Sequence, residues 1–155
     1  MTEKRLRNGY TTGTCAAAAA KAAAAFFAQA TRQKTFTYSE LTLPGGGSCR
    51  IPVIPFLKEG EPFCFGVQKD SGDDPDVTTG AWIYATVSIC EENNNQIEID
   101  GGIGVGRVTR PGLDQPVGNA AINTVPRQMI AKEVSEVCHL FDFQGGIKVV
   151  ISVPE

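Results

Sequence analysis

Three loops hold most of the residues in this 155-residue chain whose chemistry suggests a binding or reaction site. They are residues 8–15 (NGYTTGTC), 69–80 (KDSGDDPDVTTG) and 100–118 (DGGIGVGRVTRPGLDQPVG). The first loop leads into an alanine-rich segment. A helix N-terminus attracts carboxylates and phosphates, because its first N–H groups are unpaired and carry partial positive charge. Thr11, Thr12 and Thr14 add hydroxyl groups, which suit either an ordinary capped helix or an anion site.

The second loop is acidic. Asp70, Asp73, Asp74 and Asp76 have the oxygen ligands that hard cations prefer, and they also suit a cationic group on a ligand. The EF-hand pattern is not met, since Ala81 stands where the bidentate glutamate is needed. The loop therefore stays open between a cation or ligand site and a turn in which aspartates cap local amides.

The third loop carries regularly spaced glycines after a predicted strand at 96–99. Gly102, Gly104 and Gly106 imitate the glycine loop of many S-adenosylmethionine-binding Rossmann domains, where the backbone approaches the cofactor closely. A GxGxxG fingerprint is not met, because Arg107 occupies the third glycine position. Residues 108–112 cannot form the helix that should follow, because they contain Pro111. We expect a glycine loop that approaches a ligand by a different geometry.

Nucleophilic hydrolysis is disfavoured. His139 is the single histidine, at the end of a predicted helix where a structural role is expected, and no GxSxG elbow is present. The five cysteines form no CxxC pair, so we expect reduced thiols rather than a zinc site or a disulfide framework.

Charge and hydropathy exclude other classes. The net charge is −3, and a net +5 over residues 1–34 contrasts with −8 over the remainder. Nucleic-acid-binding domains are usually strongly basic, so no nucleic-acid partner is expected. No apolar run reaches the roughly 20 residues of a membrane span, and no signal peptide is recognisable. We expect a cytoplasmic protein without membrane contact.

The elements that must position these loops are two helices and several strands. A helix is predicted at 14–30, where eleven alanines occur, and another at 125–138 with Thr124 as its N-cap. Strands are predicted at 35–43 and 48–54 as a hairpin, at 63–69, at 81–90 with 96–99 pairing back on it, and at 147–153. This pattern predicts one α+β domain over residues 1–155, a two-layer sandwich of a mostly antiparallel sheet with two helices.

Long motifs in these loops resemble one family. NGYTTGTCAAAAAKAA at 8–23, KDSGDDPDVTTGAWI at 69–83 and GGIGVGRVTRPGLDQPVGNAAINTVPRQMI at 101–130 are similar to CbiD, the cobalt-precorrin-5B C1-methyltransferase family of anaerobic cobalamin biosynthesis. The motifs follow the family order and span essentially the whole chain. Proteins of that family are about twice as long, so the resemblance implies an N-terminal half of a two-domain enzyme.

The resemblance implies methylation of ring carbon 1 of a cobalt-corrinoid intermediate, with S-adenosylmethionine as methyl donor. Cobalt would be present only within the substrate, so no protein metal site is expected. Gly102, Gly104 and Gly106 are the candidate cofactor-binding residues. Asp73, Asp74 and Asp76 are the candidate catalytic residues, which would polarise the macrocycle or orient a cation. The candidates for binding the acidic rim of the substrate are Thr11, Thr12, Thr14, Lys69, Arg107, Arg110 and Arg127.

Two other classes remain open. The domain could bind an anionic macrocycle without catalysis, if the cofactor site lies in a second domain. It could instead be a small α+β domain that binds RNA or assembles complexes, although the acidic body and sparse aromatic residues disfavour RNA. The sequence leaves the oligomeric state open, including a homo-oligomer.

Overall fold

The computed structural model describes residues 10–29, 35–56, 62–70, 80–90 and 96–154. This part of the chain forms two helices and seven strands. In order they are α1 (Thr12–Ala28), β1 (Tyr38–Thr42), β2 (Ser48–Pro52), β3 (Ile54–Pro55), β4 (Phe63–Gln68), β5 (Trp82–Ile89), β6 (Ile97–Gly101), α2 (Thr124–Leu140) and β7 (Ile147–Ser152).

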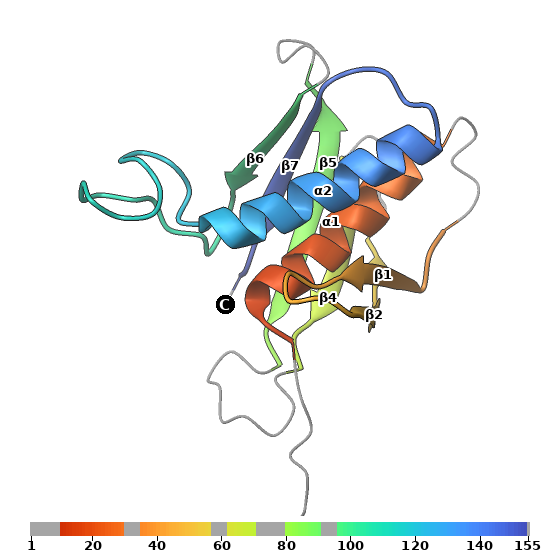
Figure 1. Ribbon diagram of the computed structural model, residues 1–155, viewed down its shortest axis with the longest axis horizontal. Coiled ribbons are helices and arrows are strands. Elements are labelled where there is room, and N and C mark those ends of the chain that lie inside the picture. Colours follow the sequence, from red (N-terminus) through yellow and green to blue (C-terminus); the bar gives the residue numbers. More distant parts are fainter. Residues whose placement is uncertain (1–9, 30–34, 57–61, 71–79, 91–95, 155) are drawn as a thin grey trace, which may run out of the picture.

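The strands form two sheets. β1 and β2 pair as an antiparallel hairpin across the turn at 43–47, which confirms the predicted hairpin. The other five strands form one sheet in the order β3-β4-β5-β7-β6, antiparallel except for the parallel pair β6 and β7. Both helices lie on the same face of this sheet, and the hairpin lies beside α1 (Figure 1). The predicted α+β two-layer sandwich is thereby confirmed.

The alanine helix lies at the centre of this arrangement. α1 contacts α2, β4, β5 and β1, and almost its whole surface is buried. Alanine has a high helix propensity, and its single methyl group lets neighbouring elements approach the helix axis closely. Burial alternates along β5, and its inward residues Ile83, Ala85 and Val87 are fully buried beneath the helix. Ile89 continues the same alternation but is 55% exposed at the strand end.

The predicted pairing of β6 with β5 is wrong. β7 lies between them, and β6 runs parallel to β7 from Ile97 opposite Ile147 to Gly101 opposite Ile151. The physical reason is burial: β7 alternates buried and half-buried residues as a central strand should, whereas β6 carries Glu98 and Asp100 and suits an edge. β6, α2 and β7 therefore form a βαβ unit, which the predicted pairing of 96–99 with 81–90 did not suggest.

A buried ion pair fastens α1 to α2. The Glu133 side chain is 3% exposed, and its Oε2 lies 3.2 Å from Lys21 Nζ. Its Oε1 accepts a hydrogen bond from the Thr42 backbone N–H at 3.2 Å. Lys21 also donates to the Glu40 carbonyl oxygen, and Ser39 Oγ donates to the Ala18 carbonyl oxygen at 2.8 Å. The hairpin is thus fixed to both helices by polar contacts.

We expect Lys21→Met to lower the free energy of unfolding by about 3 kcal/mol, because removal of one partner leaves the Glu133 carboxylate buried without its cation. Urea unfolding would measure the change. The control is Arg50→Met, which breaks the pair between Arg50 and Glu40, whose side chains are both 61% exposed. Little change is expected there, and equal losses in the two variants would contradict a special role for the buried pair.

Candidate functional site

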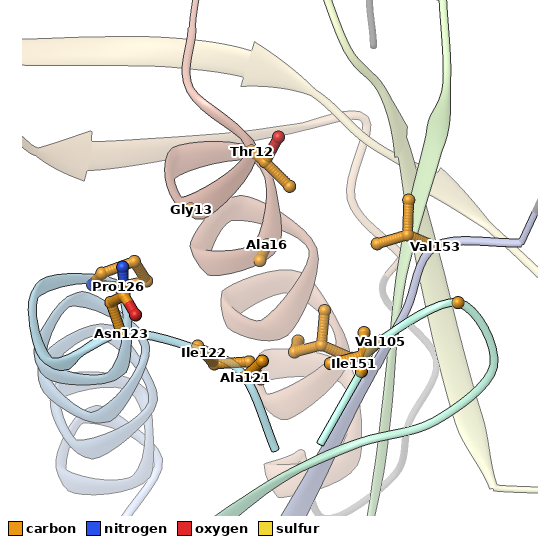
Figure 2. A pocket seen from close by; sticks show the side chains of 12 residues that line it. Thr12, Gly13, Ala16, Val105, Ala121, Ile122, Asn123, Pro126, Ile151 and Val153 are labelled. Atoms are coloured by element: carbon orange, nitrogen blue, oxygen red, sulfur yellow. The ribbon is translucent and has the colours of Figure 1, made fainter. Parts of the chain in front are cut away.

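A pocket of about 360 Å³ opens where the N-terminal turns of both helices meet the ends of β6 and β7. We call it the Gly106 pocket. Its walls include Thr12 and Ala16 of α1, Gly104 and Gly106 of the glycine loop, Ile122 before α2, and Val153 after β7. Figure 2 shows Thr12 and Ala16 of α1 on one side and Val105, Ile151 and Val153 on another. None of the described residues that line it is charged.

The topology explains the position of this pocket. β6 and β7 are parallel and therefore end at the same edge of the sheet. The chain leaves β6 through the glycine loop at that edge, and α2 begins nearby at Thr124. Ligands in open α/β sheets commonly bind outside the carboxyl ends of parallel strands, where helix N-termini also gather. The glycine loop thus lies in a ligand-binding geometry although its sequence fails the dinucleotide fingerprint.

The three predicted cofactor glycines have different structural roles. Gly102 packs closely against β7, and an added Cβ would lie 2.5 Å from Ser152 Oγ. Gly104 has φ +80°, and a Cβ there would collide with the Val153 carbonyl oxygen. Gly106 has no heavy atom within 4 Å of such a Cβ and lines the pocket. Gly102 and Gly104 shape the loop, and Gly106 leaves the pocket open.

The threonines at the start of α1 also have different roles: two of them form the helix cap and one lines the pocket. Thr11, one of the three threonines considered for capping, is the N-cap, and its Oγ1 accepts a hydrogen bond from the Thr14 backbone N–H at 3.0 Å. The two hydroxyl oxygens of Thr11 and Thr14 are 2.9 Å apart. Thr12 lies on the pocket side of the helix. Of the three, Thr12 is the residue placed to meet a ligand in the Gly106 pocket.

Arg127 holds one wall of the pocket in place. Its Nε donates to the Ile122 carbonyl at 2.6 Å, one terminal nitrogen to the Ala120 carbonyl at 2.9 Å, and the other to the Ile99 carbonyl at 3.3 Å. The guanidinium therefore joins the segment before α2 to the edge strand β6. These bonds engage three of its five N–H donors with backbone, so the substrate-binding role predicted for Arg127 gains no support from its placement.

The other two candidate arginines lie outside the pocket. Arg107 is paired with Asp100 at 2.6 Å and donates to the Gly101 carbonyl at 3.2 Å. The Arg107 hydrogen bond is the main reason that the pKa of Asp100 falls below its ordinary value. Arg110 is exposed in the long loop that extends away from the sheet before α2 (Figure 1).

Lys69 is buried, with only 5% of its surface exposed. It lies near Cys15, whose pKa is raised to about 11, chiefly by burial and against the opposing effect of the Lys69 charge. The Cys15 thiol is therefore protonated near neutral pH and is a poor nucleophile. The neighbouring Asp70 carbonyl accepts the Tyr10 backbone N–H at 2.8 Å, which brings the acidic loop's first residue to the N-terminal loop. Asp73, Asp74 and Asp76 lie outside the described residues.

The residue that caps α2 differs from the one that the sequence predicted. Asn123 is the N-cap position and makes no side-chain cap, while Thr124, predicted as the cap, is the first helical residue. The Asp114 carboxylate fills this role from the long loop: Oδ2 accepts from the Thr124 backbone N–H and, at 2.9 Å, from its hydroxyl. Local sequence rules look one to three residues upstream, so a cap ten residues away escapes them.

Part of the predicted site is brought together. Thr12, Gly104 and Gly106 share the Gly106 pocket, and Thr11 and Thr14 lie directly beside it. Arg107, Arg110 and Lys69 do not line it. The apolar walls, such as Val105, Ile122 and Val153, carried no chemical signal in the sequence and could not have been found from it.

We expect Arg127→Lys to speed amide hydrogen exchange at Ala121 and Ile122 by about tenfold or more, because the single nitrogen of an ammonium group cannot reach three carbonyls that three separate guanidinium nitrogens contact. The Ala121 and Ile122 N–H groups donate to Gly106 and Ala120 and report directly on this wall. NMR-detected exchange on the folded protein gives the rates. Arg110→Lys, in the exposed loop, is the control, and unaltered exchange in Arg127→Lys would show that the wall does not depend on this guanidinium.

We expect the Asp114 carboxyl to titrate below its ordinary pKa, mainly because the Thr124 backbone N–H donates to the carboxylate. Its contribution to α2 is therefore present at neutral pH and disappears as the pH falls through the lowered pKa. Thr124→Val removes the hydroxyl donor but keeps the backbone donor, so the pKa should rise only part of the way. Carbon-detected NMR titration measures both, and a wild-type pKa at or above the ordinary value would refute the cap.

The sequence of this chain is similar to those of known proteins. A family model described as CbiD matches residues 1–155. Proteins named cobalt-precorrin-5B C(1)-methyltransferase are 50% identical over 153 residues in Geobacillus kaustophilus and 47% identical over 155 residues in Geobacter sp. strain M21. These matches cover 99% of this chain but only 40% and 42% of those relatives.

A solved structure has the same fold. The 1.9 Å crystal structure of the cobalamin biosynthesis protein (cbiD) from Archaeoglobus fulgidus superposes with a TM-score of 0.69 at 29% identity. The superposition covers 96% of this chain and 45% of that one. No helix in the described part of this chain is long and apolar enough to cross a membrane. On the family match and these similarities, this chain belongs to the CbiD family.

Proposed function

We propose that this chain takes part in the S-adenosylmethionine-dependent methylation of ring carbon 1 of a cobalt-precorrin, and that the Gly106 pocket holds the methyl donor. The observation that carries the proposal is the uncharged, glycine-walled pocket at the carboxyl ends of β6 and β7. The names of the relatives support the reaction, and the length of this chain relative to them leaves the complete activity to be tested.

The pocket suits the donor in size and polarity. Its volume of about 360 Å³ lies in the range of small-molecule sites. Apolar side chains of Val105, Ile122 and Val153 would pack against the nucleoside, and the N-terminal turn of α1 at Thr12 would favour the donor's carboxylate. Gly106 matters because it forms part of the pocket wall, and a larger side chain there would change that wall without meeting any heavy atom within 4 Å of its Cβ.

The chemistry demands little from individual side chains. S-adenosylmethionine supplies a methyl group already activated by the sulfonium charge. The chain's task is to align the reactants and exclude water from them, which apolar walls and a rigid loop accomplish. Asp73, Asp74 and Asp76 remain proposed for polarising the macrocycle or orienting a cation.

Carboxylate groups on the rim of the acceptor would be received by cations around the pocket. Arg110 is the exposed candidate, and Arg107 and Lys69 remain proposed contacts. Cobalt is part of the substrate in this scheme, and the chain itself would hold no metal. The reaction is proposed for a soluble enzyme in the cytoplasm.

The alternative function is a holder for an anionic macrocycle that lacks its own donor site. The observation in its favour is coverage, because the chain matches only about 40% of the length of its relatives. In that case the donor would bind to a part of the enzyme that this chain does not include.

We expect calorimetric titration with S-adenosylhomocysteine to show binding to the wild-type chain and at least about tenfold weaker binding to Gly106→Leu. Gly106 lines the pocket, and a leucine there would add bulk to this wall without a collision at Cβ or a left-handed backbone. Gly45→Leu, at a glycine that also has open space around it, is the matched control and should bind as the wild type does.

Two outcomes would count against the proposal. Equal affinities of Gly106→Leu and the wild type would place the donor elsewhere on the chain. Absence of binding to a folded wild-type chain would favour the macrocycle holder without a donor site.

A further inference from the structure

A second cavity runs along the other side of the contact between the two helix N-termini. It consists of two adjoining hollows of about 480 and 510 Å³ that share Leu43, Pro44, Val125 and Met129. Tyr10 lines one end and Lys132 the other. We call this continuous depression between the β1–β2 turn and α2 the hairpin groove.

The hairpin groove and the Gly106 pocket have two wall residues in common, Gly13 and Pro126. α1 and α2 approach each other closely at these residues, since a Cβ on Gly13 would lie 2.9 Å from Pro126 Cγ. Figure 2 shows Gly13 and Pro126 on the facing turns of the two helices. A single thin partition therefore separates the two cavities.

The walls of the groove are held firmly. Gly46 at φ +92° and Gly47 at φ +79° close the tight turn that presents Leu43 and Pro44 to α2. The adjacent Thr42 N–H donates to Glu133 of α2, which sets the distance between the turn and the helix. The glycine-rich turn therefore forms one wall of the groove in addition to reversing the chain.

The lining has a definite chemical character. Leu43, Pro44, Val125 and Met129 offer apolar surface, and Val125 is 52% exposed. Lys132 is the charged side chain among the described residues that line the groove, and no acidic side chain lines it. The first turn of α1, with Thr11 and Thr14, adds the partial positive charge of a helix N-terminus at the other end. Such a surface suits a large flat ligand with apolar faces and an anionic rim.

We propose that the hairpin groove binds the cobalt-corrinoid acceptor, beside a donor in the Gly106 pocket. The inference rests on the proposed function and adds the position of the acceptor. Methyl transfer requires the reacting atoms to approach to about 3–3.5 Å, so the donor and acceptor sites must adjoin. The partition at Gly13 and Pro126 is where they do so, and the corrinoid edge would cross it to meet the donor.

The test uses cobyrinic acid, a cobalt corrinoid with free carboxylates, and S-adenosylhomocysteine as separate probes in calorimetric titrations. Val125→Asp places a negative charge in the groove, where it would repel the carboxylates of cobyrinic acid. The position is exposed and near a helix N-terminus, where aspartate is tolerated. We expect it to weaken cobyrinic acid binding at least tenfold and leave S-adenosylhomocysteine binding unchanged. Val117→Asp is the matched control, at a valine that is 56% exposed in the long loop, and should change neither affinity.

The possible results separate this inference from the proposed function. Unchanged cobyrinic acid affinity in folded Val125→Asp overturns the groove assignment, even if the donor analogue binds. Loss of cobyrinic acid binding in Val125→Asp supports it, even if the donor analogue binds to no variant. Absence of cobyrinic acid binding to the wild type overturns the groove assignment, because the groove then holds no acceptor. A change of oligomeric state in Val125→Asp, measured by sedimentation, also overturns it, because a second copy of the chain would then cover the groove.

Discussion

The close approach of other elements to the alanine helix α1 is the constraint on which this structure depends. A helix with larger side chains at these positions would hold the sheet, α2 and the hairpin further from its axis. Because the residues of α1 are mostly alanine, all three neighbours pack directly against it. The same closeness brings Gly13 against Pro126 and so places two helix N-termini at one edge of the sheet.

Polar contacts complete what apolar packing begins. Ser39, Lys21 and Glu133 fix the hairpin to the helices, and Arg127 fixes the segment before α2 to β6. Each satisfies a backbone or side-chain group that would otherwise be costly to bury. These contacts also set the shapes of both cavities, so the side chains that stabilise the fold are the ones that define where ligands fit.

The sequence predicted the elements better than their connections. The strand at Trp82–Ile89, the hairpin across Pro44 and both helices follow from local patterns of alternation, turn residues and alanine content. The position of β6 at the edge, parallel to β7, does not. Strand order depends on which strands bury most surface in the complete sheet, and the short distance in sequence between β5 and β6 gives no information about that competition.

For the site, the sequence determined which residues could do chemistry, and the tertiary structure decided which of them share a cavity. The glycine loop and the threonine-rich helix start were identifiable because their residue types are rare outside turns and caps. That Gly106 faces open space while Gly102 packs against β7 and Gly104 against Val153 just after it could be decided only by the path of a segment about fifty residues away. The same applies to Arg127 and Asp114, whose partners are backbone atoms of distant segments, because a backbone carbonyl or N–H has no sequence signature.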